Sequence, residues 1–377
     1  MKILHAISSI DPRHGGTSEA VVQLSREAIR HGHEIEIASI DDPSGAWIRE
    51  FPLPLHALGP GKTAFQYSGK FQAWLQENIP RFDAVVSHAL WQWTGVAVRT
   101  ACGGHHPYFV FPHGMLDPYF DQFPLKRLKK SFFWPWADRR VLRDARAIFF
   151  TSEEERLGAH RSFPSLRGND VIAPLGIDEP PAFTPAMEAA FAEKLPGLEG
   201  RRYLLFLGRI HLKKGCDLLL RAWSQLAAAH PELCLVMAGP DQTGWTSELQ
   251  TITRERVFWP GMLTGDAKWG ALHGAEAFVL PSHQENFGIA VAEALACATP
   301  VLISKKVNIW REIVAAGGGF AQDDTDSGTS ALLHDFLALD PAAKTALRRS
   351  ARQCFENHFR LSSAAELLHN HIARLIS

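Results

Sequence analysis

Short apolar runs alternate with longer segments of helical periodicity along most of the chain. The runs are rich in β-branched and aromatic residues, and most lack the polar alternation of a half-exposed strand, which is typical of strands buried in a parallel sheet. The pattern predicts strands over residues 1–8, 33–40, 83–88, 108–111, 147–150, 203–207, 233–240, 257–261, 277–280 and, as the final core strand, 299–303.

Apolar residues at helical spacing separate these runs. Helices are predicted over residues 18–31, 65–78, 90–101, 289–297, 331–338, 342–355 and 361–376, and another opens at 151 with a capping-box pattern. Alternation of strand and helix implies parallel sheets with helices on both faces. At 377 residues the chain is long enough for two such domains. Pro180, Pro181 and Pro185 indicate a linker, so the boundary is expected near 178–185.

Composition narrows the class of protein. Lys and Arg number 39 against 40 Asp and Glu, so there is no overall charge to favour nucleic acid. The five cysteines are scattered without CxxC spacing and are expected to be reduced thiols of a cytosolic protein. The first apolar run is too short for a signal peptide, and no run approaches the ~20 apolar residues of a spanning helix. We therefore expect a soluble protein, or one bound at most to a membrane surface.

Two glutamates eight residues apart flank a strand-to-helix turn. Glu293 is the only ionisable group on a helix of small apolar residues, and its carboxylate needs a donor, which a pair of ligand hydroxyls would supply. Glu285 lies on the loop beside Gly288, where a missing Cβ lets backbone N–H groups approach a phosphate or sugar. The alternative is a loop glutamate and a helix glutamate in a surface salt bridge, and spacing alone favours that alternative.

Glycines and cations follow two other predicted strands. Gly15 and Gly16 come after the first strand, and they form either a ligand-facing loop or only a tight turn. Arg209 and Lys214, in Gly-Arg-x4-Lys-Gly, follow the first strand of the second half, and both could bind one diphosphate. Surface cations in loops are ordinary, so neither pattern decides the function alone.

Two features of the first half remain open on sequence alone. His113, in His-Gly after the strand at 108–111, is either a ligand contact or a structural histidine. Residues 125–146 mix basic and aromatic side chains, which suits anionic lipid headgroups or a phosphorylated acceptor, but equally suits a solvated basic face over core aromatics. The cations proposed for such a contact are Lys126, Arg127, Lys129 and Lys130.

The order and spacing of these motifs resemble the retaining GT-B glycosyltransferases of the GT4 family (glycosyl transferases group 1). The resemblance spans nearly the whole chain. It implies an α/β GT-B fold of two Rossmann-like domains facing a cleft, with a terminal helix that crosses back to the first domain. The implied boundaries are 1–178 for acceptor binding, 179–357 for nucleotide-sugar binding and 358–377 for the terminal helix. The loop at 304–313 departs from the common glycine-rich sequence, so its contacts are in doubt.

The resemblance also implies the site residues. The implied catalytic residues are His113, Arg209, Lys214 and Glu285. The implied donor-binding residues are Gly15, Gly16, Arg209, Lys214, Gly261, Met262, Glu285, Asn286, Phe287, Gly288, Ile289 and Glu293. The resemblance also implies that no metal and no cofactor are needed beyond the nucleotide-diphosphate sugar. Cations together with a helix N-terminus would neutralise the leaving diphosphate.

The implied activity is retaining hexosyl transfer from a nucleotide-diphosphate sugar to an acceptor hydroxyl by front-face displacement, in bacterial polysaccharide or glycolipid biosynthesis. The alternatives are a sugar-nucleotide epimerase of GT-B fold and a non-catalytic nucleotide-sugar-binding protein. A phosphorolytic enzyme of similar architecture is disfavoured, because this chain has no cofactor-lysine context. The expected partners are the donor and a sugar or lipid-linked sugar acceptor, without nucleic acid. The expected location is the cytoplasm, with peripheral membrane contact through 125–146.

Overall fold

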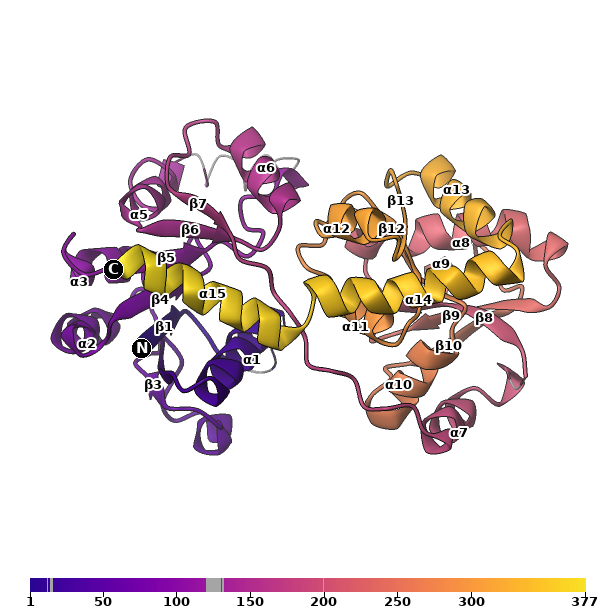
Figure 1. Cartoon of the computed structure of the whole chain (residues 1–377), viewed down its shortest axis with the longest axis horizontal. Helices are drawn as coiled ribbons and strands as arrows, with labels where there is room; N and C mark the ends of the chain where they lie inside the picture. The colour runs from indigo at the N-terminus through magenta and orange to yellow at the C-terminus, as the bar shows by residue number, and fades with distance from the viewer. Residues whose placement is uncertain (12, 14–15, 120–129, 131, 199) are drawn as a thin grey trace. The chain divides into compact units, whose positions relative to one another are not determined.

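The chain folds into two α/β units (Figure 1). Unit 1 comprises Met1–Asp178 and Leu361–Ser377, and unit 2 comprises Glu179–Arg360. The structure is a computed structural model, and it describes all residues except 12, 14–15, 120–129, 131 and 199. The predicted α/β class, with one parallel sheet in each half, is confirmed.

Unit 1 contains a seven-stranded parallel sheet in the order β3-β2-β1-β4-β5-β6-β7. Its strands are β1 (Lys2–Ile7), β2 (Glu34–Ser39), β3 (Leu55–Ala57), β4 (Ala84–His88), β5 (Tyr108–Phe111), β6 (Ala147–Phe150) and β7 (Asp170–Ile172). The central strands β4, β5 and β6 are buried along their whole length, because helices cover both faces of a parallel sheet.

The helices of unit 1 are α1 (Gly16–Arg30), η2 (Ala46–Glu50), α2 (Gly69–Asn78), η3 (Ile79–Arg81), α3 (Trp93–Cys102), α5 (Asp138–Asp144), α6 (Glu153–Ser162) and α15 (Leu361–Ile376). The terminal helix α15 packs against α1, with Leu368 and Ile372 buried. In Figure 1 this yellow helix runs along unit 1, so the two ends of the chain belong to one unit. Helix α2 begins four residues later than predicted because Ser68 caps it by accepting from the Phe71 N–H.

Unit 2 contains a six-stranded parallel sheet in the order β10-β9-β8-β11-β12-β13. Its strands are β8 (Arg202–Leu207), β9 (Leu233–Ala238), β10 (Val257–Gly261), β11 (Ala277–Leu280), β12 (Val301–Ser304) and β13 (Gly319–Gln322). The prediction that the chain ends its strands at 299–303 was wrong, because β13 adds an edge strand beside β12. A Cβ at Gly319 would lie 1.9 Å from the Val301 carbonyl oxygen, so this pairing needs glycine.

The helices of unit 2 are α7 (Pro185–Lys194), η5 (Pro196–Leu198), η6 (Leu212–Lys214), α8 (Cys216–Leu226), η7 (Ala227–Ala229), α9 (Thr246–Leu249), α10 (Gly265–Gly274), α11 (Ile289–Ala296), α12 (Trp310–Ala315), α13 (Asp326–Leu337) and α14 (Pro341–His358). Two of them fall where the sequence predicts irregular chain. Pro185, expected in a linker, instead opens α7, where a proline at the first helical position lacks only an N–H that the helix does not use. Helix α12 begins within the predicted loop at 304–313 and continues to Ala315.

Strand order reverses its direction at one point in each sheet. In unit 1 the chain moves outward from β1 on one side and from β4 on the other, and in unit 2 the corresponding pair is β8 and β11. Loops that leave the carboxyl ends of such a pair diverge and create a crevice, which is where ligands bind in open parallel sheets. The predicted residues Arg209, Lys214 and Glu285 all lie on loops at the reversal in unit 2.

All five cysteines are buried free thiols. Across the part of the chain that the structure describes, none of the helices combines the length and the apolar character needed to cross a bilayer.

Candidate active site

The loop after β8 carries the two predicted cations of unit 2. It continues from Gly208 into η6, where the ring Nδ1 of His211 accepts from the Lys213 N–H at 3.1 Å. Gly215 then turns the chain into α8 with φ 67°. A Cβ at Gly215 would lie 2.2 Å from the Pro281 carbonyl oxygen, so the Lys-Gly sequence is required by the close approach of this loop to the loop after β11.

Direct hydrogen bonds join these two loops. The Lys213 carbonyl oxygen accepts from the Ser282 hydroxyl at 2.8 Å and from the His283 N–H at 2.8 Å. The Lys214 ammonium forms an ion pair with the Glu285 carboxylate. The structure therefore brings together two predicted catalytic residues that lie 71 positions apart in the sequence.

Arg209 lies on the same loop with an exposed side chain. It has neither a carboxylate partner nor a side-chain hydrogen bond within the described residues. Burial lowers the pKa of His211, and the positive charges of Arg209, Lys213 and Lys214 lower it further. All three cations lie on the short segment between β8 and α8, at this edge of the sheet, and Arg209 remains available to an anion.

The loop that carries Glu285 is held by its backbone. The Glu285 N–H donates to the Lys306 carbonyl at 2.9 Å, and the Asn308 N–H donates to the Glu285 carbonyl at 2.9 Å. The Asn308 side-chain amide also donates to Asn286 Oδ1 at 3.3 Å. The segment after β12, whose contacts were in doubt from the sequence, thus fixes the loop on which Glu285 and Asn286 lie.

Gly288 caps α11 in a left-handed conformation, with φ 76°, and Ile289 opens the helix. A Cβ at Gly288 would come within 3.1 Å of Val291 and 3.2 Å of the Glu285 side chain, so a larger residue would displace the glutamate. The Phe287 side chain is buried and meets Phe359 edge-on at 5.9 Å. The predicted donor contact at Phe287 is therefore restricted to its backbone.

Glu293 has a donor that the sequence did not predict. Its Oε1 lies 2.7 Å from Lys268 Nζ, and Lys268 comes from α10, beside α11. The ammonium of Lys268 also lies 3.9 Å from the centroid of the Trp269 ring, which restricts where it can move. The expected need of Glu293 for a donor is thus met by Lys268, and the contact with ligand hydroxyls stays a prediction. No local sequence pattern links residues 25 positions apart on different helices.

Gly261 and Met262 follow β10 as predicted. Gly261 has φ 73°, and its carbonyl oxygen accepts from the Gly239 N–H at 2.8 Å. Gly239 in turn approaches the loop after β8, because a Cβ there would lie 1.8 Å from the Gly208 carbonyl oxygen. Met262 is exposed. The carboxyl ends of β8, β9, β10 and β11 therefore present one connected set of loops.

In unit 1, His113 follows β5 with φ 51°, a left-handed conformation that is uncommon for a residue with a Cβ. Next to it, the Gly114 N–H donates to Glu155 Oε1 at 2.5 Å. The other carboxylate oxygen of Glu155 accepts from the Thr151 N–H and hydroxyl, both at 2.7 Å. Glu155 is buried, and this burial raises its pKa. This carboxylate therefore ties the His-Gly loop to the start of α6.

The sequence predicts Glu155 only as part of a capping box. Ser152 does accept from the Glu155 N–H at 3.1 Å, which confirms the cap. The glutamate side chain, however, reaches the His-Gly loop in place of the Ser152 N–H, so sequence reasoning identified the residue but not its role.

Of the predicted glycine pair after β1, only Gly16 belongs to the described residues. Gly16 opens α1, and a Cβ added to it would meet no other atom within 4 Å. A side chain would therefore fit at this position without a steric clash. Gly15 lies outside the described residues, so its predicted contact with the donor stays a prediction.

The basic and aromatic stretch is only partly described, since Lys126, Arg127 and Lys129 lie outside the described residues. Lys130 points inward: its Nζ donates to the Met115 carbonyl at 3.0 Å and lies 4.9 Å from the Trp91 ring. Its assignment to a lipid-facing patch was therefore wrong. Trp134 is buried, whereas Phe132 and Trp136 are each 69% exposed.

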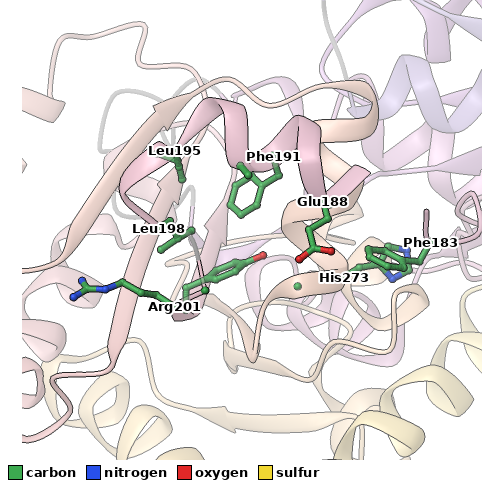
Figure 2. Close-up of a pocket in the computed structure, with 12 residues that line it drawn as sticks. Phe183, Glu188, Phe191, Leu195, Leu198, Arg201 and His273 are labelled. Atoms are coloured by element: carbon green, nitrogen blue, oxygen red, sulfur yellow. The ribbon is translucent and has the colours of Figure 1, made fainter. Parts of the chain in front are cut away.

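A separate pocket of about 350 Å³ lies at the amino end of β8 (Figure 2). Helix α7, η5 and the end of α10 line it, mainly with apolar side chains, and Glu188 and His273 are among the lining residues that Figure 2 labels. Arg209 follows the opposite, carboxyl end of β8. None of the predicted site residues lines this pocket. Within the described ranges, no group of three His, Cys, Asp or Glu side chains is arranged so that it could hold a metal ion.

Two family models match the chain in succession. The "Glycosyl transferase 4-like domain" matches residues 15–174, and "Glycosyl transferases group 1" matches residues 188–353. Together they account for most of both units.

Individual proteins agree with these matches. The chain is 25% identical to the D-inositol 3-phosphate glycosyltransferase of Kineococcus radiotolerans, over 90% of this chain and 86% of that protein. It is 31% identical to the glycogen synthase of Mycobacterium tuberculosis over 51% of this chain, and it spans about half of that protein, 48%. The crystal structure of Anabaena HepE in complex with UDP and glucose superposes with a TM-score of 0.74 at 16% identity, covering 99% of this chain and 100% of HepE.

The two parallel sheets, the order of the motifs and the two matched domains agree with one another. The chain belongs to the GT4 family of glycosyltransferases and has the GT-B fold.

Proposed function

We propose that this glycosyltransferase moves a hexose from a nucleoside-diphosphate sugar to an acceptor hydroxyl with retention of the anomeric configuration. The observation that carries the proposal is the contact of Lys214 with Glu285 at the carboxyl edge of the sheet of unit 2, with Arg209 on the same loop as Lys214. Relatives support a nucleotide-sugar donor, since HepE was crystallised with UDP and glucose. A sugar-nucleotide epimerase or a non-catalytic binding protein would use the same groups without an acceptor.

The positive charges of Arg209 and Lys214 would stabilise a departing diphosphate. Negative charge on the leaving group is largest in the transition state, so cations that already lie in place stabilise the transition state more than the bound donor. Arg209 is free of carboxylates in the described structure and offers a planar fork for two phosphate oxygens. Lys214 is paired with Glu285, so a phosphate that reaches Lys214 also brings the donor close to that carboxylate. We infer that Arg209 and Lys214 replace a metal ion in neutralising the diphosphate.

The two glutamates are proposed to bind different parts of the donor. Glu285, on the loop, would accept hydrogen bonds from the sugar hydroxyls, and Glu293, on α11, would accept from the ribose hydroxyls while Lys268 holds its other side. His113 would contact the sugar from unit 1. Backbone groups at Gly261 and Met262 would contact the base, which leaves base choice largely independent of side chains.

We also propose a peripheral membrane contact for a lipid-linked acceptor, now on different residues. Phe132 and Trp136 are exposed and four positions apart in helical turns, where the Ala137 N–H donates to the Phe133 carbonyl at 2.9 Å. Arg139 and Arg140 are exposed beside them, and the Arg140 guanidinium lies 5.9 Å from the Trp136 ring. Aromatic side chains flanked by cations suit the headgroup region of an anionic bilayer.

The test is a panel of nucleoside-diphosphate sugars with and without sugar and lipid-linked acceptors, read as released nucleoside diphosphate and product. We expect release that depends on acceptor, persists in excess EDTA, and gives a product whose anomeric proton coupling matches the donor. An inverted product would refute retention, and loss of activity restored by Mg²⁺ or Mn²⁺ would refute the cation mechanism. Interconversion of donors without acceptor would identify an epimerase.

A further inference from the structure

Three histidine rings form a continuous hydrogen-bonded chain in unit 1. His5 Nδ1 lies 2.8 Å from His88 Nε2, and His88 Nδ1 lies 2.9 Å from His113 Nε2. The rings come from β1, from the end of β4 and from the loop after β5. Since β1 and β4 are the neighbours at which the strand order of this sheet reverses, the chain of rings begins inside the core and ends at the carboxyl edge, at the His-Gly loop.

The surroundings keep these rings neutral. His5 and His88 are almost completely buried, and Phe111 stacks on His88 at 5.7 Å and on His113 at 5.2 Å. Burial lowers the pKa of His5 to about 3 and of His113 to about 4, and it lowers the pKa of His88 well below its ordinary value. The other titratable group acting on His5 is His369 of α15, which burial also keeps neutral, with a pKa of about 4.

Neutrality restricts where the protons lie. A neutral imidazole has one N–H and one bare nitrogen, and each ring-to-ring hydrogen bond needs one of each. If His88 carries its proton on Nδ1, it donates to His113 and must accept from His5, so every ring is protonated on Nδ1. If His88 carries its proton on Nε2, it donates to His5 and must accept from His113, so every ring is protonated on Nε2. Mixed arrangements leave one hydrogen bond without a proton or with two.

We propose that His88, backed by His5, is a positioning residue that sets the tautomer of His113 and thereby decides whether His113 Nδ1 donates or accepts. The inference rests on the proposed contact of His113 with the donor sugar, because only then does the polarity of Nδ1 affect the reaction. The three rings act as one unit. Because each ring-to-ring hydrogen bond fixes the tautomer of the next ring, a change of tautomer at His113 requires the same change at His88 and His5.

The first test needs no activity. The full-length protein is labelled with ¹⁵N histidine, and the ring nitrogens of His5, His88 and His113 are assigned with single glutamine variants. We expect the three rings to be neutral and in one common tautomer. Replacement of His88 by Phe removes both ring-to-ring hydrogen bonds, so His5 and His113 should no longer be held in the same tautomer. A mixed set of tautomers, or a positively charged ring at neutral pH, would overturn the proposal. His160, which bonds to Asp170 at 2.6 Å outside the chain of rings, is the control: its replacement should leave the three spectra unchanged.

The second test separates positioning from general destabilisation. An Asn amide nitrogen can occupy the place of ring Nδ1 and keep the bond to His113, whereas His88→Phe removes both bonds. We expect His88→Phe to lower kcat by about tenfold, the value of one hydrogen bond, while leaving nucleoside-diphosphate affinity within twofold, and His88→Asn to restore part of the loss. Equal losses in both variants, in proportion to their melting temperatures, would indicate a structural role only. If wild-type protein transfers no sugar, the proposed function fails while the spectra still decide the common tautomer.

Discussion

Lys268 Nζ lies 2.7 Å from Glu293 Oε1, so the helix glutamate of the motif is paired with a cation from the neighbouring helix α10. Both side chains are only partly exposed, which makes this pair a means of holding the carboxylate in one orientation. We expect Lys268→Met to weaken nucleoside-diphosphate binding by about tenfold, the value of one charge-assisted hydrogen bond. Calorimetry measures the effect. Lys268→Arg is the conservative control, and unchanged affinity in the Met variant would mean that Glu293 needs no such support.

The two glutamates should differ in what they bind. Glu293→Gln is expected to weaken nucleoside diphosphate even without a sugar, because its proposed partners are the ribose hydroxyls. Glu285→Gln is expected to spare the nucleoside diphosphate and to impair the nucleotide sugar. Titration of each variant with both ligands checks this, and equal loss of nucleoside-diphosphate affinity in both would show that the two roles are misassigned.

The cations should affect turnover more than binding. Arg209→Ala and Lys214→Ala are each expected to lower kcat by roughly 100- to 1,000-fold, because charge on the leaving diphosphate peaks in the transition state. In Lys214→Ala, Glu285 also loses its ion-pair partner, so this variant is expected to lose more. Steady-state kinetics provide the measurement, with the neighbouring Lys213→Ala as control. Rates within threefold of wild type in both variants would refute diphosphate binding here.

Asp138 should give unit 1 a pH-dependent stability. Its Oδ1 accepts from the Trp91 N–H at 2.9 Å, while Oδ2 is buried without a hydrogen-bond partner within the described residues. Burial raises the pKa of Asp138 from 3.8 to about 6. The folded protein therefore holds this proton to higher pH than the unfolded chain, and the free energy of unfolding falls as pH rises through that interval.

The fall attributable to Asp138 is up to about 3 kcal/mol between pH 4 and pH 7. Asp138→Asn should remove this fall. In urea unfolding, the free energy of unfolding of the variant should therefore rise relative to that of wild type, by the same amount, as pH rises. Asp144→Asn is the control with the opposite sign, because Arg143 and Arg99 lower the pKa of Asp144. A difference between wild type and Asp138→Asn that is constant with pH would contradict the prediction.

The exposed aromatic pair should mediate membrane binding. We expect the double variant Phe132→Ser, Trp136→Ser to stop sedimenting with anionic liposomes at low salt while its donor affinity is unchanged. Phe183, an exposed aromatic of unit 2, provides the matched control variant Phe183→Ser. Each cation near an anionic surface contributes about 1 kcal/mol, so high salt should release the wild type. If wild-type protein fails to sediment at low salt, the acceptor is soluble and the contact is absent.

The sequence by itself determined the class of fold and the motifs at the carboxyl edges. Buried parallel strands are nearly continuous apolar runs, so 277–280 and 108–111 were predicted with the bounds that the structure has. The glycines that permit close approach of loops, such as Gly215, also appear as a local pattern. These signals are readable because they depend on the nearest neighbours in the chain.

Tertiary structure alone decided which side chains meet. Lys268 with Glu293, Glu155 with Gly114, and His5 with His88 are pairs separated by 25, 41 and 83 positions. Their proximity follows from strand order and helix packing, and no periodicity records it. The same holds for β13, a short edge strand that forms because Gly319 lets the backbone approach Val301. A sequence specifies local conformation directly, but it specifies contacts across a sheet only through the whole fold.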